Sequence, residues 1–441
     1  MTSQIKQRIE QINNGQVPEG YKETEFGIFP CDWVTDKTFG DLFSFNGGLG
    51  KSREELSENG IEYLHYGDMH RSDFNIASLE QYSKLPKYDT KIKGDESFLM
   101  QDGDVAFLDA SEDLEGTSRS VLIDNPENKP FIAGLHIIYG RPRGKELSKY
   151  YKQYLTRPEY IKKQFKKLAS GFKVYGLNRN TITGIKCAYP KFTAEQEKIA
   201  EILMKWDEAI VLYDRQIEKL KRLKLVCIKK MFPKKRSKVP EVRFKGFTKD
   251  WEQRKLGELG TITTGNTPST SIPDYYSDDG IVWVTPTDIC ENITFESARK
   301  LSDLGQQVGR VVPKNTILVT CIASIGKNTM LGNTGSFNQQ INGLTPNENK
   351  YDPYFLLTES ALWSAKMKGS AASGTMQIVN RTEFSELKTW LPSLIEQQAI
   401  GAFFKQLDNL ITLHQRKVEK IKTQRKALQQ YLLNGIVRVE V

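Results

Sequence analysis

The sequence contains one pattern twice, and this duplication constrains the fold more than any other feature. Each copy carries a Ser-Gly turn, an Asn, a Pro and a Glu-Gln pair, followed by a long charged segment with helical periodicity. The matched residues are Asn178 and Asn380, Pro190 and Pro392, Glu195 and Glu396, and Gln196 and Gln397. A globular unit with its own helix, present in duplicate, predicts a protein that does one thing at two places a fixed distance apart.

The length and composition indicate a protein of several domains. Its 441 residues are too many for one ordinary core, so two or more domains are expected. No apolar run approaches the ~18 residues needed to cross a membrane, and the polar N-terminal segment does not match a signal peptide. The five cysteines form no CxxC pair, which argues against a zinc site and for a reducing compartment. We therefore expect a cytoplasmic protein without a membrane segment.

Basic residues concentrate in and after the two long helical segments. The formal net charge is +9, and Lys and Arg gather in residues 215–238 and 416–426. One interpretation is a polyanionic partner, most simply nucleic acid. The other is a solvated helix face followed by a basic linker, and charge alone does not decide between them.

Both charged segments carry an apolar stripe with heptad spacing. Thr193 with Gln196, and Ser393 with Glu396, form the capping-box pattern that begins a helix, so the first helix should start at Thr193. The stripe residues are Ile199, Leu203, Trp206, Ile210, Tyr213, Ile217 and Leu220, and then Ile400, Phe404, Leu407, Ile411, His414, Val418 and Ile421. A helix with one apolar stripe needs a partner, most simply the other copy in an antiparallel coiled coil. An intermolecular partner is the alternative.

One basic residue follows each stripe in register. Lys224 and Arg425 stand at equivalent seam positions, where a polar residue usually fixes register or partner at a cost in stability. His414 on the second stripe is interpreted as a packed residue rather than a ligand. Helices of roughly 40 residues should be about 60 Å long, which compares with one to two turns of B-DNA.

The segments before the helices predict two α/β (α+β) domains. Expected strands are Val105–Leu108 and residues 132–139, 281–284 and 316–321, and expected helices are residues 150–168 and 353–367. The predicted organisation is an N-terminal helix (1–16), a first domain (17–190), a central helix (191–232), a linker with a second domain (233–392), and a C-terminal helix (393–441). The domain edges match and the middles diverge, which predicts one scaffold with two different reading surfaces.

Several polar and basic residues fit contacts with DNA. The loop Gly47-Gly48-Leu49-Gly50-Lys51-Ser52 and its counterpart Thr264-Gly265-Asn266-Thr267 could bring backbone N–H groups to phosphates. Asn, Gln, Arg and Lys can also pair with base edges in the major groove. The candidates are Lys51, Arg53, Lys173, Tyr175, Asn178, Arg179, Asn266, Thr287, Lys327, Gln339, Gln340, Gln377, Asn380 and Arg381. A turn or core role is the alternative for each of them.

Signals for catalysis are weak. Gly50-Lys51-Ser52 resembles the end of a phosphate-binding loop, but Phe45 stands where that pattern requires glycine. Asp352-Pro353-Tyr354 lacks one proline of the Asp-Pro-Pro-Tyr tetrapeptide of amino-methyltransferases. The four histidines form no HExxH site, and no GxSxG elbow occurs. The chain is therefore expected not to be an enzyme by itself.

The ordered duplication resembles the specificity subunit of type I restriction-modification systems over essentially the whole chain. The stretches that carry the resemblance are residues 190–199 and 392–400, the helices after them, Asp32-Trp33, Asp250-Trp251, and Trp283-Val284-Thr285 with Asp288-Ile289. In the first domain Tyr63-Leu64-His65-Tyr66 with Asp68-Met69 stands at the position of the last motif. That difference fits a different DNA half-site.

The resemblance implies a non-catalytic DNA-binding subunit in which each domain reads one half of a bipartite site. The two helices would form an antiparallel coiled coil that sets the spacer and docks two modification subunits. Those subunits would bind S-adenosylmethionine and methylate adenine N6, and two restriction subunits using ATP and Mg2+ would complete the nuclease. This chain would hold no cofactor and no metal. The alternatives are a stand-alone DNA methyltransferase or nuclease, and a coiled-coil protein scaffold.

Overall fold

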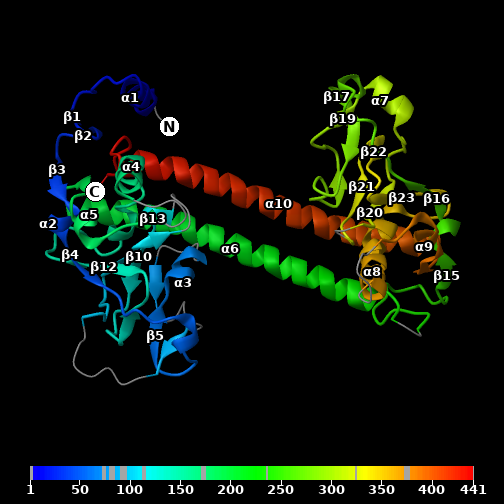
Figure 1. Ribbon diagram of the computed structural model, residues 1–441, viewed down its shortest axis with the longest axis horizontal. Helices are drawn as coiled ribbons and strands as arrows, with labels where there is room; N and C mark the ends of the chain where they lie inside the picture. The colour runs from blue at the N-terminus through cyan, green and yellow to red at the C-terminus, as the bar shows by residue number, and fades with distance from the viewer. Residues whose placement is uncertain are drawn as a thin grey trace. The chain divides into compact units, whose positions relative to one another are not determined.

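The chain forms two compact units that are described separately. The computed structural model describes residues 3–71, 76–78, 85–89, 97–111, 116–169, 175–234, 237–322, 325–371 and 378–440. Unit 1 comprises Met1–Leu212 and Val418–Val441, and unit 2 comprises Tyr213–Lys417 (Figure 1). Within the described ranges, no helix combines the length and the apolar character that a membrane span requires.

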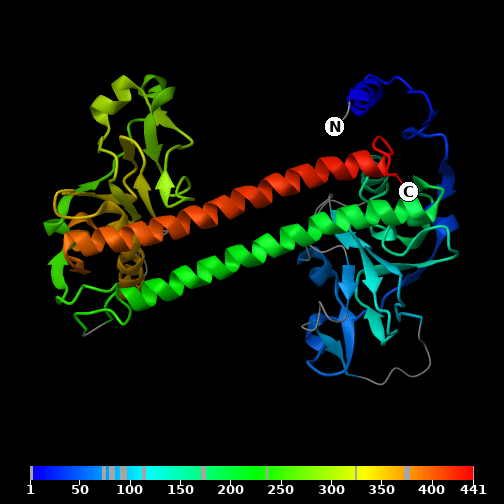
Figure 2. The same ribbon diagram turned by 180° about the vertical axis from the view of Figure 1, so that it is seen from behind.

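Two long helices, α6 (Thr193–Met231) and α10 (Leu394–Leu433), contribute one half each to both units. The start of α6 at Thr193 confirms the sequence prediction. In unit 1, Leu203 of α6 shares a core with Leu432 of α10, while Arg438, just beyond α10, reaches Glu195 in the first turn of α6. Residue numbers thus rise along one helix as they fall along the other, so the two halves in unit 1 pack antiparallel (Figures 1 and 2).

The halves of α6 and α10 in unit 2 also pack antiparallel. Met231 shares a core with Phe404, and the Tyr213 ring lies edge-on to His414 at a centroid distance of 5.6 Å. His414 therefore packs on the seam, as the sequence predicts. Leu223 is 48% exposed, whereas the neighbouring Lys224 is half-buried, so the seam runs through the lysine.

Unit 1 contains a five-stranded and a three-stranded sheet. The five-stranded order is β4-β12-β8-β10-β6, in which only β10 and β6 pair parallel. These strands are β4 (Phe43–Gly47), β6 (Ile76–Ser78), β8 (Val105–Leu108), β10 (Ser120–Asp124) and β12 (Ile137–Pro142). The three-stranded sheet, β11-β5-β7, consists of β5 (Ile61–Leu64), β7 (Lys87–Tyr88) and β11 (Phe131–Ala133).

Unit 2 repeats both sheets with the same order and the same strand directions. Its five-stranded order is β16-β23-β20-β21-β18, with only β18 and β21 parallel, and its three-stranded order is β19-β17-β22. The strands are β16 (Gly260–Thr264), β17 (Tyr276–Val284), β18 (Ile293–Thr294), β19 (Lys300–Leu301), β20 (Ile317–Thr320), β21 (Asn328–Leu331), β22 (Gly335–Phe337) and β23 (Ile341–Pro346). One scaffold therefore underlies the two divergent sequences, which confirms the predicted fold class.

The remaining elements complete this shared plan. Two-stranded pairs are β1-β2, β13-β9, β14-β3 and β15-β24. Their bounds are β1 (Tyr21–Thr24), β2 (Gly27–Pro30), β3 (Trp33–Thr38), β9 (Ala110–Ser111), β13 (Tyr175–Gly176), β14 (Lys186–Pro190), β15 (Glu252–Lys255) and β24 (Lys388–Leu391). The shorter helices are α1 (Ser3–Asn13), α2 (Phe39–Leu42), α3 (Tyr66–Arg71), α4 (Glu159–Leu168), α5 (Arg179–Thr183), α7 (Asp303–Val308), α8 (Pro353–Ala371) and α9 (Arg381–Glu386). Short 3-10 turns are η1 (Arg53–Glu55), η2 (Gly116–Ser118), η3 (Lys152–Tyr154), η4 (Leu256–Glu258) and η5 (Pro273–Tyr275).

Alternating side chains bury both faces of each five-stranded sheet. In β8, Val105 and Phe107 pack with α4 and α6, while Ala106 and Leu108 pack toward the three-stranded sheet. In unit 2, Ile317 and Val319 of β20 join the helix-side core and Leu318 joins the other. Each unit is thus a helix layer, a large sheet and a small sheet, and the large sheet positions the loops at its edge.

One buried position differs chemically between the two units. The N–H of Ala188 in β14 donates to the Tyr160 hydroxyl at 2.8 Å, whereas the matching N–H of Trp390 in β24 donates to the Glu359 carboxyl at 3.2 Å. Glu359 is 3% exposed, and burial raises the pKa of its carboxyl to about 7. Unit 2 therefore carries in its core a carboxyl that titrates near neutral pH, where unit 1 carries a phenol.

Two predicted elements of unit 1 are divided in the structure. The helix predicted over residues 150–168 is split into η3 and α4, because Pro158 takes an extended conformation and precedes the first residue of α4. The strand predicted over residues 132–139 is split into β11 and β12 by a turn in which His136 has φ +59°. In unit 2, α8 extends slightly beyond its prediction, to Ala371.

Candidate nucleic-acid interface

Three segments of unit 1 meet at the ends of β4, β5 and β11. Leu49 N–H donates to Ala133 O at 2.8 Å, and Gly134 N–H donates to Leu64 O at 3.0 Å. Residues 48–53, 65–68 and 134–136 are joined by these bonds, and together we call them loop face 1. Backbone hydrogen bonds thus fix the three segments at the junction of the two sheets, and the segments in turn position the side chains of this face.

Unit 2 builds the same face with the same bonds. Asn266 N–H donates to Phe337 O at 3.0 Å, and Asn338 N–H donates to Val284 O at 3.0 Å. Residues 265–267, 285–288 and 338–340 form this loop face 2. Three further N–H to O bonds of unit 1 have a counterpart in unit 2. Gly48 to Ile137 matches Gly265 to Ile341, Asp109 to His136 matches Cys321 to Gln340, and Leu177 to Asp109 matches Val379 to Cys321. The two faces therefore share a backbone framework despite different sequences.

Glycine is required at one matched position of each face because two backbones pass closely. A Cβ on Gly48 would lie 2.0 Å from Gly134 O, and a Cβ on Gly265 would lie 2.2 Å from both Phe337 O and Asn338 O. The N–H groups of Gly48, Leu49 and Lys51 are all bonded within unit 1. These three donors are therefore already used within the unit, and Gly48 and Gly265 serve close packing of two backbones.

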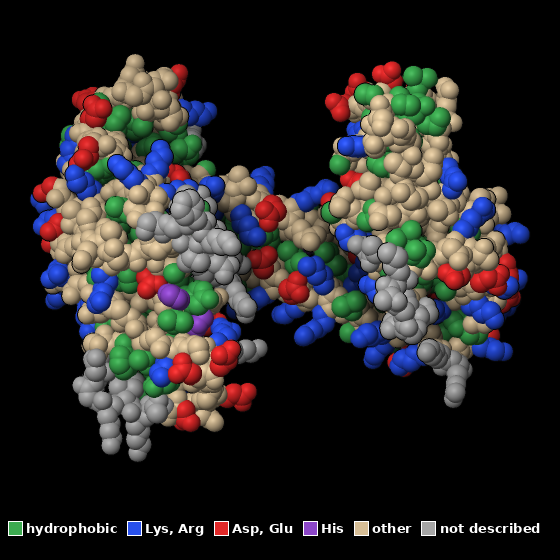
Figure 3. All heavy atoms as spheres, in the orientation of Figure 1, with side chains coloured by type: hydrophobic (Ala, Val, Ile, Leu, Met, Phe, Trp, Pro, Cys, Tyr) green, Lys and Arg blue, Asp and Glu red, His purple; other side chains and the backbone are tan. Residues whose placement is uncertain are grey.

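The side chains of loop face 1 form an aromatic and imidazole cluster. The His65 and Tyr66 rings lie 4.4 Å apart, and Tyr66 meets His136 edge-on at 5.3 Å. His136 Nδ1 lies 2.9 Å from Asp109 Oδ1, and the His136 side chain is 43% exposed. His65 is buried to 7% exposure, and this burial lowers its pKa. Figure 3 shows histidine at the surface of unit 1 next to hydrophobic and acidic side chains.

Loop face 2 carries amides and hydroxyls instead. Thr267 Oγ1 donates to Gln339 Oε1, and Asn338 Nδ2 donates to Gln340 Oε1 at 3.0 Å. Thr287 bonds the neighbouring Thr285 hydroxyl at 2.8 Å. Gln339 and Thr287 are exposed and Gln340 is half-buried, so the structure brings these three sequence candidates together. Amide side chains are able to pair with base edges, adenine above all.

Basic residues border both faces, but most are already paired. Lys51 lies 2.9 Å from Glu55, and Arg53 lies 2.6 Å from Asp68. Lys327 donates to Pro286 O at 3.0 Å, and Arg310, which sequence reasoning missed, donates to Thr264 O at 2.6 Å.

Two arginines at matched positions differ from these. Arg179 and Arg381 are the first residues of α5 and α9, are exposed, and have no hydrogen bond or ion pair within the described residues. The Arg179 guanidinium lies next to Gly47, since a Cβ there would be 3.9 Å from its Cζ. Within the part of the chain that the structure describes, both guanidinium groups are therefore available to phosphate.

The predicted asparagines have structural duties. Asn178 and Asn380 are the N-caps of α5 and α9, where their side chains accept from Thr181 N–H and Glu383 N–H at 2.9 Å each. Asn266 donates to Val308 O and accepts from Arg310 N–H, both at 2.8 Å. Tyr175 lies in β13, paired with β9 beside loop face 1. The candidates Lys173 and Gln377 lie outside the described residues.

The sequence prediction did not include His65, Tyr66 and His136 of loop face 1. It also did not include Asp109, which contacts His136, or Arg310, which contacts Asn266. The motif containing His65 and Tyr66 was matched to Thr285 and Pro286, and the parallel strand registers confirm that match. The same comparison extended to β12 and β23 aligns His136 with Gln340, which is one of the residues predicted from the sequence. Alignment of the strands between the two copies is therefore the sequence signal that could have identified these residues.

The Glu-Gln pairs join each long helix to its unit. Gln196 Nε2 donates to Pro190 O at 2.8 Å, and Gln397 Nε2 donates to Pro392 O at 2.9 Å. Gln196 Oε1 accepts from Ser148 N–H at 2.7 Å rather than serving the expected capping box. The contact is kept although Gln196 follows its proline by six residues and Gln397 by five.

The glutamates of the same pairs accept from arginines that follow the other helix. Arg438 donates from Nε and Nη2 to Glu195 at 2.7 and 2.8 Å, and Arg243 donates in the same two-pronged way to Glu396 at 2.7 Å for both bonds. Glu396 is thus paired with Arg243 rather than forming the predicted capping box. Arg438 also bonds Asp32, and this contact lowers the pKa of the Asp32 carboxyl. Both helix starts are therefore closed by an ion pair whose glutamate is buried.

Each unit contains a polar triad on the helix seam. In unit 2, Lys224 Nζ lies 2.6 Å from Asp408 Oδ1, and the Tyr354 hydroxyl donates to Asp408 Oδ2 at 3.0 Å. In unit 1 the matching residues are Arg425, Asp207 and Tyr154, with Arg425 contacting both carboxylate oxygens at 2.9 Å. The seam cations predicted to fix register thus have defined partners in both units.

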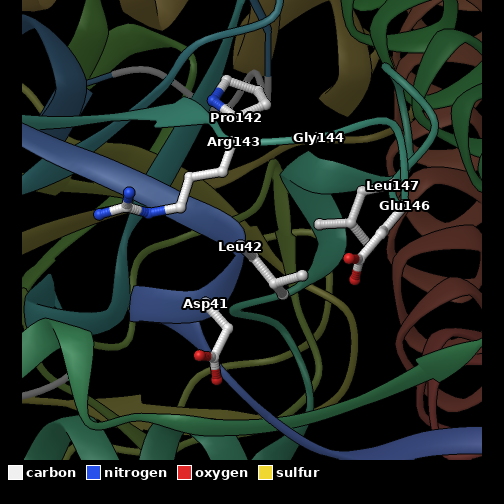
Figure 4. A pocket seen from close by; sticks show the side chains of 7 residues that line it. All are labelled: Asp41, Leu42, Pro142, Arg143, Gly144, Glu146 and Leu147. Atoms are coloured by element: carbon white, nitrogen blue, oxygen red, sulfur yellow. The ribbon is translucent and has the colours of Figure 1, made fainter.

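The described residues offer little to a small ligand or a metal. A shallow pocket in unit 1 is lined by Asp41, Leu42, Pro142, Arg143, Gly144, Glu146 and Leu147 (Figure 4). Its polar side chains are engaged within the unit: Asp41 accepts from Thr38, Arg143 donates to Gly40 O, and Glu146 accepts from Tyr189. No group of three metal-ligating side chains occurs in the part of the chain that the structure describes.

Comparison with known proteins agrees with this duplicated architecture. The family model "Type I restriction modification DNA specificity domain" matches residues 30–222 and 248–423. A putative type I restriction enzyme MjaX specificity subunit of Methanocaldococcus jannaschii is 23% identical over 96% of this chain and 97% of its own. The HindI specificity subunit of Haemophilus influenzae is 28% identical over 42% of this chain and 41% of its own.

Solved structures share the fold. The type I restriction-modification S subunit from M. genitalium matches 91% of this chain and 96% of its own, with a TM-score of 0.58 and 15% identity. A chain from a structure on complex assembly and conformational transition of the type I system matches 96% of this chain and 100% of its own, with a TM-score of 0.55 and 16% identity.

Proposed function

We propose that this chain, which belongs to the family of type I restriction modification DNA specificity domains, reads a two-part DNA site with one half assigned to each unit. One observation carries the proposal: loop faces 1 and 2 share their backbone bonds and differ in their exposed side chains. A shared framework holds the reading groups in the same geometry, and different side chains select different bases. Arg179 and Arg381, which have no hydrogen bond or ion pair within the described residues, would contact phosphates.

The two long helices set the distance between the half-sites in this proposal. The triads around Asp207 and Asp408 support it, because a charged seam residue with a defined partner disfavours sliding of one helix along the other. The exposed faces of α6 and α10 would dock two modification subunits, which bind S-adenosylmethionine and methylate adenine. Two restriction subunits using ATP and Mg2+ would complete the nuclease, and this cytoplasmic chain would contribute recognition without catalysis.

Insertion of one heptad into both helices tests the role of spacing. The inserts belong at matched places, between Asp207 and Lys224 in α6 and between Asp408 and Arg425 in α10, so that both triads are kept. Seven residues add about 10 Å of helix, roughly three base pairs of B-DNA. Methylation mapping in cells with the modification subunits should show both half-sites unchanged and a longer spacer. An unchanged spacer would contradict the proposed ruler.

Two other functions are separable from this one. A stand-alone methyltransferase would transfer a labelled methyl group from S-adenosylmethionine to DNA when the purified chain is incubated alone, whereas the proposal expects transfer only with modification subunits. A coiled-coil protein scaffold would not retain duplex DNA in a sequence-dependent way. A complex that binds all DNA sequences equally would favour the scaffold.

A further inference from the structure

His136 is an exposed side chain that the fold holds in one orientation. It lies on the turn between β11 and β12 with φ +59°, a region that non-glycine residues enter at a cost. Its backbone O accepts from Asp109 N–H at 3.1 Å, and its Nδ1 lies 2.9 Å from Asp109 Oδ1. The Tyr66 ring meets the imidazole edge-on at 5.3 Å. An exposed ring with a hydrogen bond on one side and an aromatic contact on another is preorganised for a partner.

The bond to Asp109 determines what the imidazole offers. A carboxylate accepts hydrogen bonds, so the proton of the neutral ring is placed on Nδ1. Nε2 then presents a lone pair, and it has no hydrogen bond within the described residues. In the major groove, the base-edge donors that an acceptor can read are the amino groups of adenine N6 and cytosine N4.

The same position is built for contact in unit 2. Gln340 aligns with His136, and its side-chain Oε1 is held by Asn338 at 3.0 Å. The backbone bond from Asp109 to His136 also recurs as the bond from Cys321 to Gln340. In both units, therefore, the residue directly before the matching strand of the five-stranded sheet (β12 or β23) has a polar side chain that a neighbouring side chain orients.

We infer that His136 is a specificity-determining residue of unit 1, which accepts through Nε2 a hydrogen bond from the exocyclic amino group of an adenine or a cytosine. Asp109 is its positioning residue, because it fixes the tautomer of the ring. The inference rests on the proposed function and adds to it the residue and the chemical class of the group that is read. It predicts that one base pair of one half-site depends on this imidazole.

The substitution His136→Gly removes the ring and suits the observed backbone, since glycine adopts positive φ without strain. The complex of the full chain with its modification subunits would be used to select DNA from a random-sequence library. At one base pair of one half-site, discrimination should fall on the order of tenfold or more. The second half-site and the spacer should not change. Base preferences that match those of the unmodified complex at every position would overturn the inference. A loss of affinity that is the same on all DNA sequences would also overturn it, because that result indicates a phosphate contact.

Two further variants separate positioning from folding. Asp109→Asn removes the obligate acceptor and should alter preference at the same base pair, and an effect confined to thermal stability would contradict the positioning role. Asn128→Gly is the matched control, because Asn128 also has positive φ (+49°) in unit 1 but precedes β11, whereas residues 134–136 of loop face 1 follow that strand. It should leave every base preference unchanged. If the unmodified complex selects no two-part site, the proposed function fails; if it does and His136→Gly matches it, only this inference fails.

Discussion

Units 1 and 2 agree in strand order, strand direction and the backbone bonds of their loop faces, yet their exposed side chains differ. Loop face 1 presents His136 and Tyr66, and loop face 2 presents Gln339 and Thr287. The agreement lies in backbone hydrogen bonds and in the glycines Gly48 and Gly265, where a Cβ would clash with backbone oxygens. The framework depends mainly on backbone N–H and C=O groups rather than on side chains. The exposed side chains of the loop faces can therefore differ without loss of the framework.

The largest effect is expected where the shared framework itself is broken. Gly48→Ala forces a Cβ to within 2.0 Å of Gly134 O and should destabilise unit 1 by about 3 kcal/mol or more. Gly50→Ala is the matched control, because the nearest atom to its Cβ is 3.8 Å away. Hydrogen exchange should show loss of protection in unit 1 for the first variant and none for the second. Similar protection in both would mean that the close approach is not required.

The seam triads give the next largest effect and differ between the units. Asp408→Ala leaves Lys224 and the Tyr354 hydroxyl without their partner and should cost about 3 kcal/mol in unit 2. Asp207→Ala should cost less in unit 1, because the Asp207 side chain is 33% exposed and that of Asp408 only 8%. Denaturant unfolding of each variant measures the two costs. The exposed pair Lys221–Glu218 is the control, and Glu218→Ala should change stability by less than about 0.5 kcal/mol.

A pH-dependent difference should follow from the buried carboxyl of unit 2. The folded-state pKa of Glu359 is raised to about 7, so the folded state binds its proton more tightly than the unfolded state. Its contribution to stability is fully present below the unfolded pKa near 4.5 and is lost as the pH rises through about 7. The loss is up to about 1.4 kcal/mol per pH unit in that window.

Glu359→Gln should remove this pH dependence from unit 2 and leave that of unit 1 unchanged. Thermal unfolding between pH 4.5 and 8, followed separately in the two units by hydrogen exchange, measures both. A slope that persists in the variant would assign the effect to another group.

The smallest effect concerns DNA affinity, and it is expected to be equal for the matched arginines of the two units. Neutralising Arg179 or Arg381 to Gln should weaken binding by a similar factor on all DNA sequences and reduce the salt slope by about 1 for each residue. Lys129→Gln in unit 1 is the control for simple loss of charge, since the Lys129 side chain is exposed and paired with Glu127. A change in base preference, rather than in slope, would show that these arginines read bases.

The helices and their seam could be predicted from the sequence because their signal is local and repeated. Thr193 as the start of α6 and Lys224 on the seam follow from spacing alone. The partners of those seam cations could not be predicted, because Asp408 and Asp207 come from the other helix. Periodicity fixes which face is buried but not which polar residues meet there.

The loop faces were predictable only in part, for a different physical reason. Asn178 and Asn380 have the chemistry of base readers and also of N-caps, and the sequence does not distinguish the two roles. His136 precedes β12 and Asp109 follows β8, so their contact depends on the pairing of these two strands, which a single sequence does not specify. Residues that repeat between the copies proved to be mainly structural, and those that differ occupy the loop faces.

The contact of Gln196 with Pro190 and of Gln397 with Pro392 survives a difference of one residue in the connecting segment. Each unit is thus attached to its helix through a junction that tolerates a change in length without losing its bond. Such a junction would suit the exchange of units between related chains. A foreign recognition unit joined at this glutamine would bring its own loop face and inherit the existing helix, so new DNA specificities could arise by recombination rather than by gradual substitution.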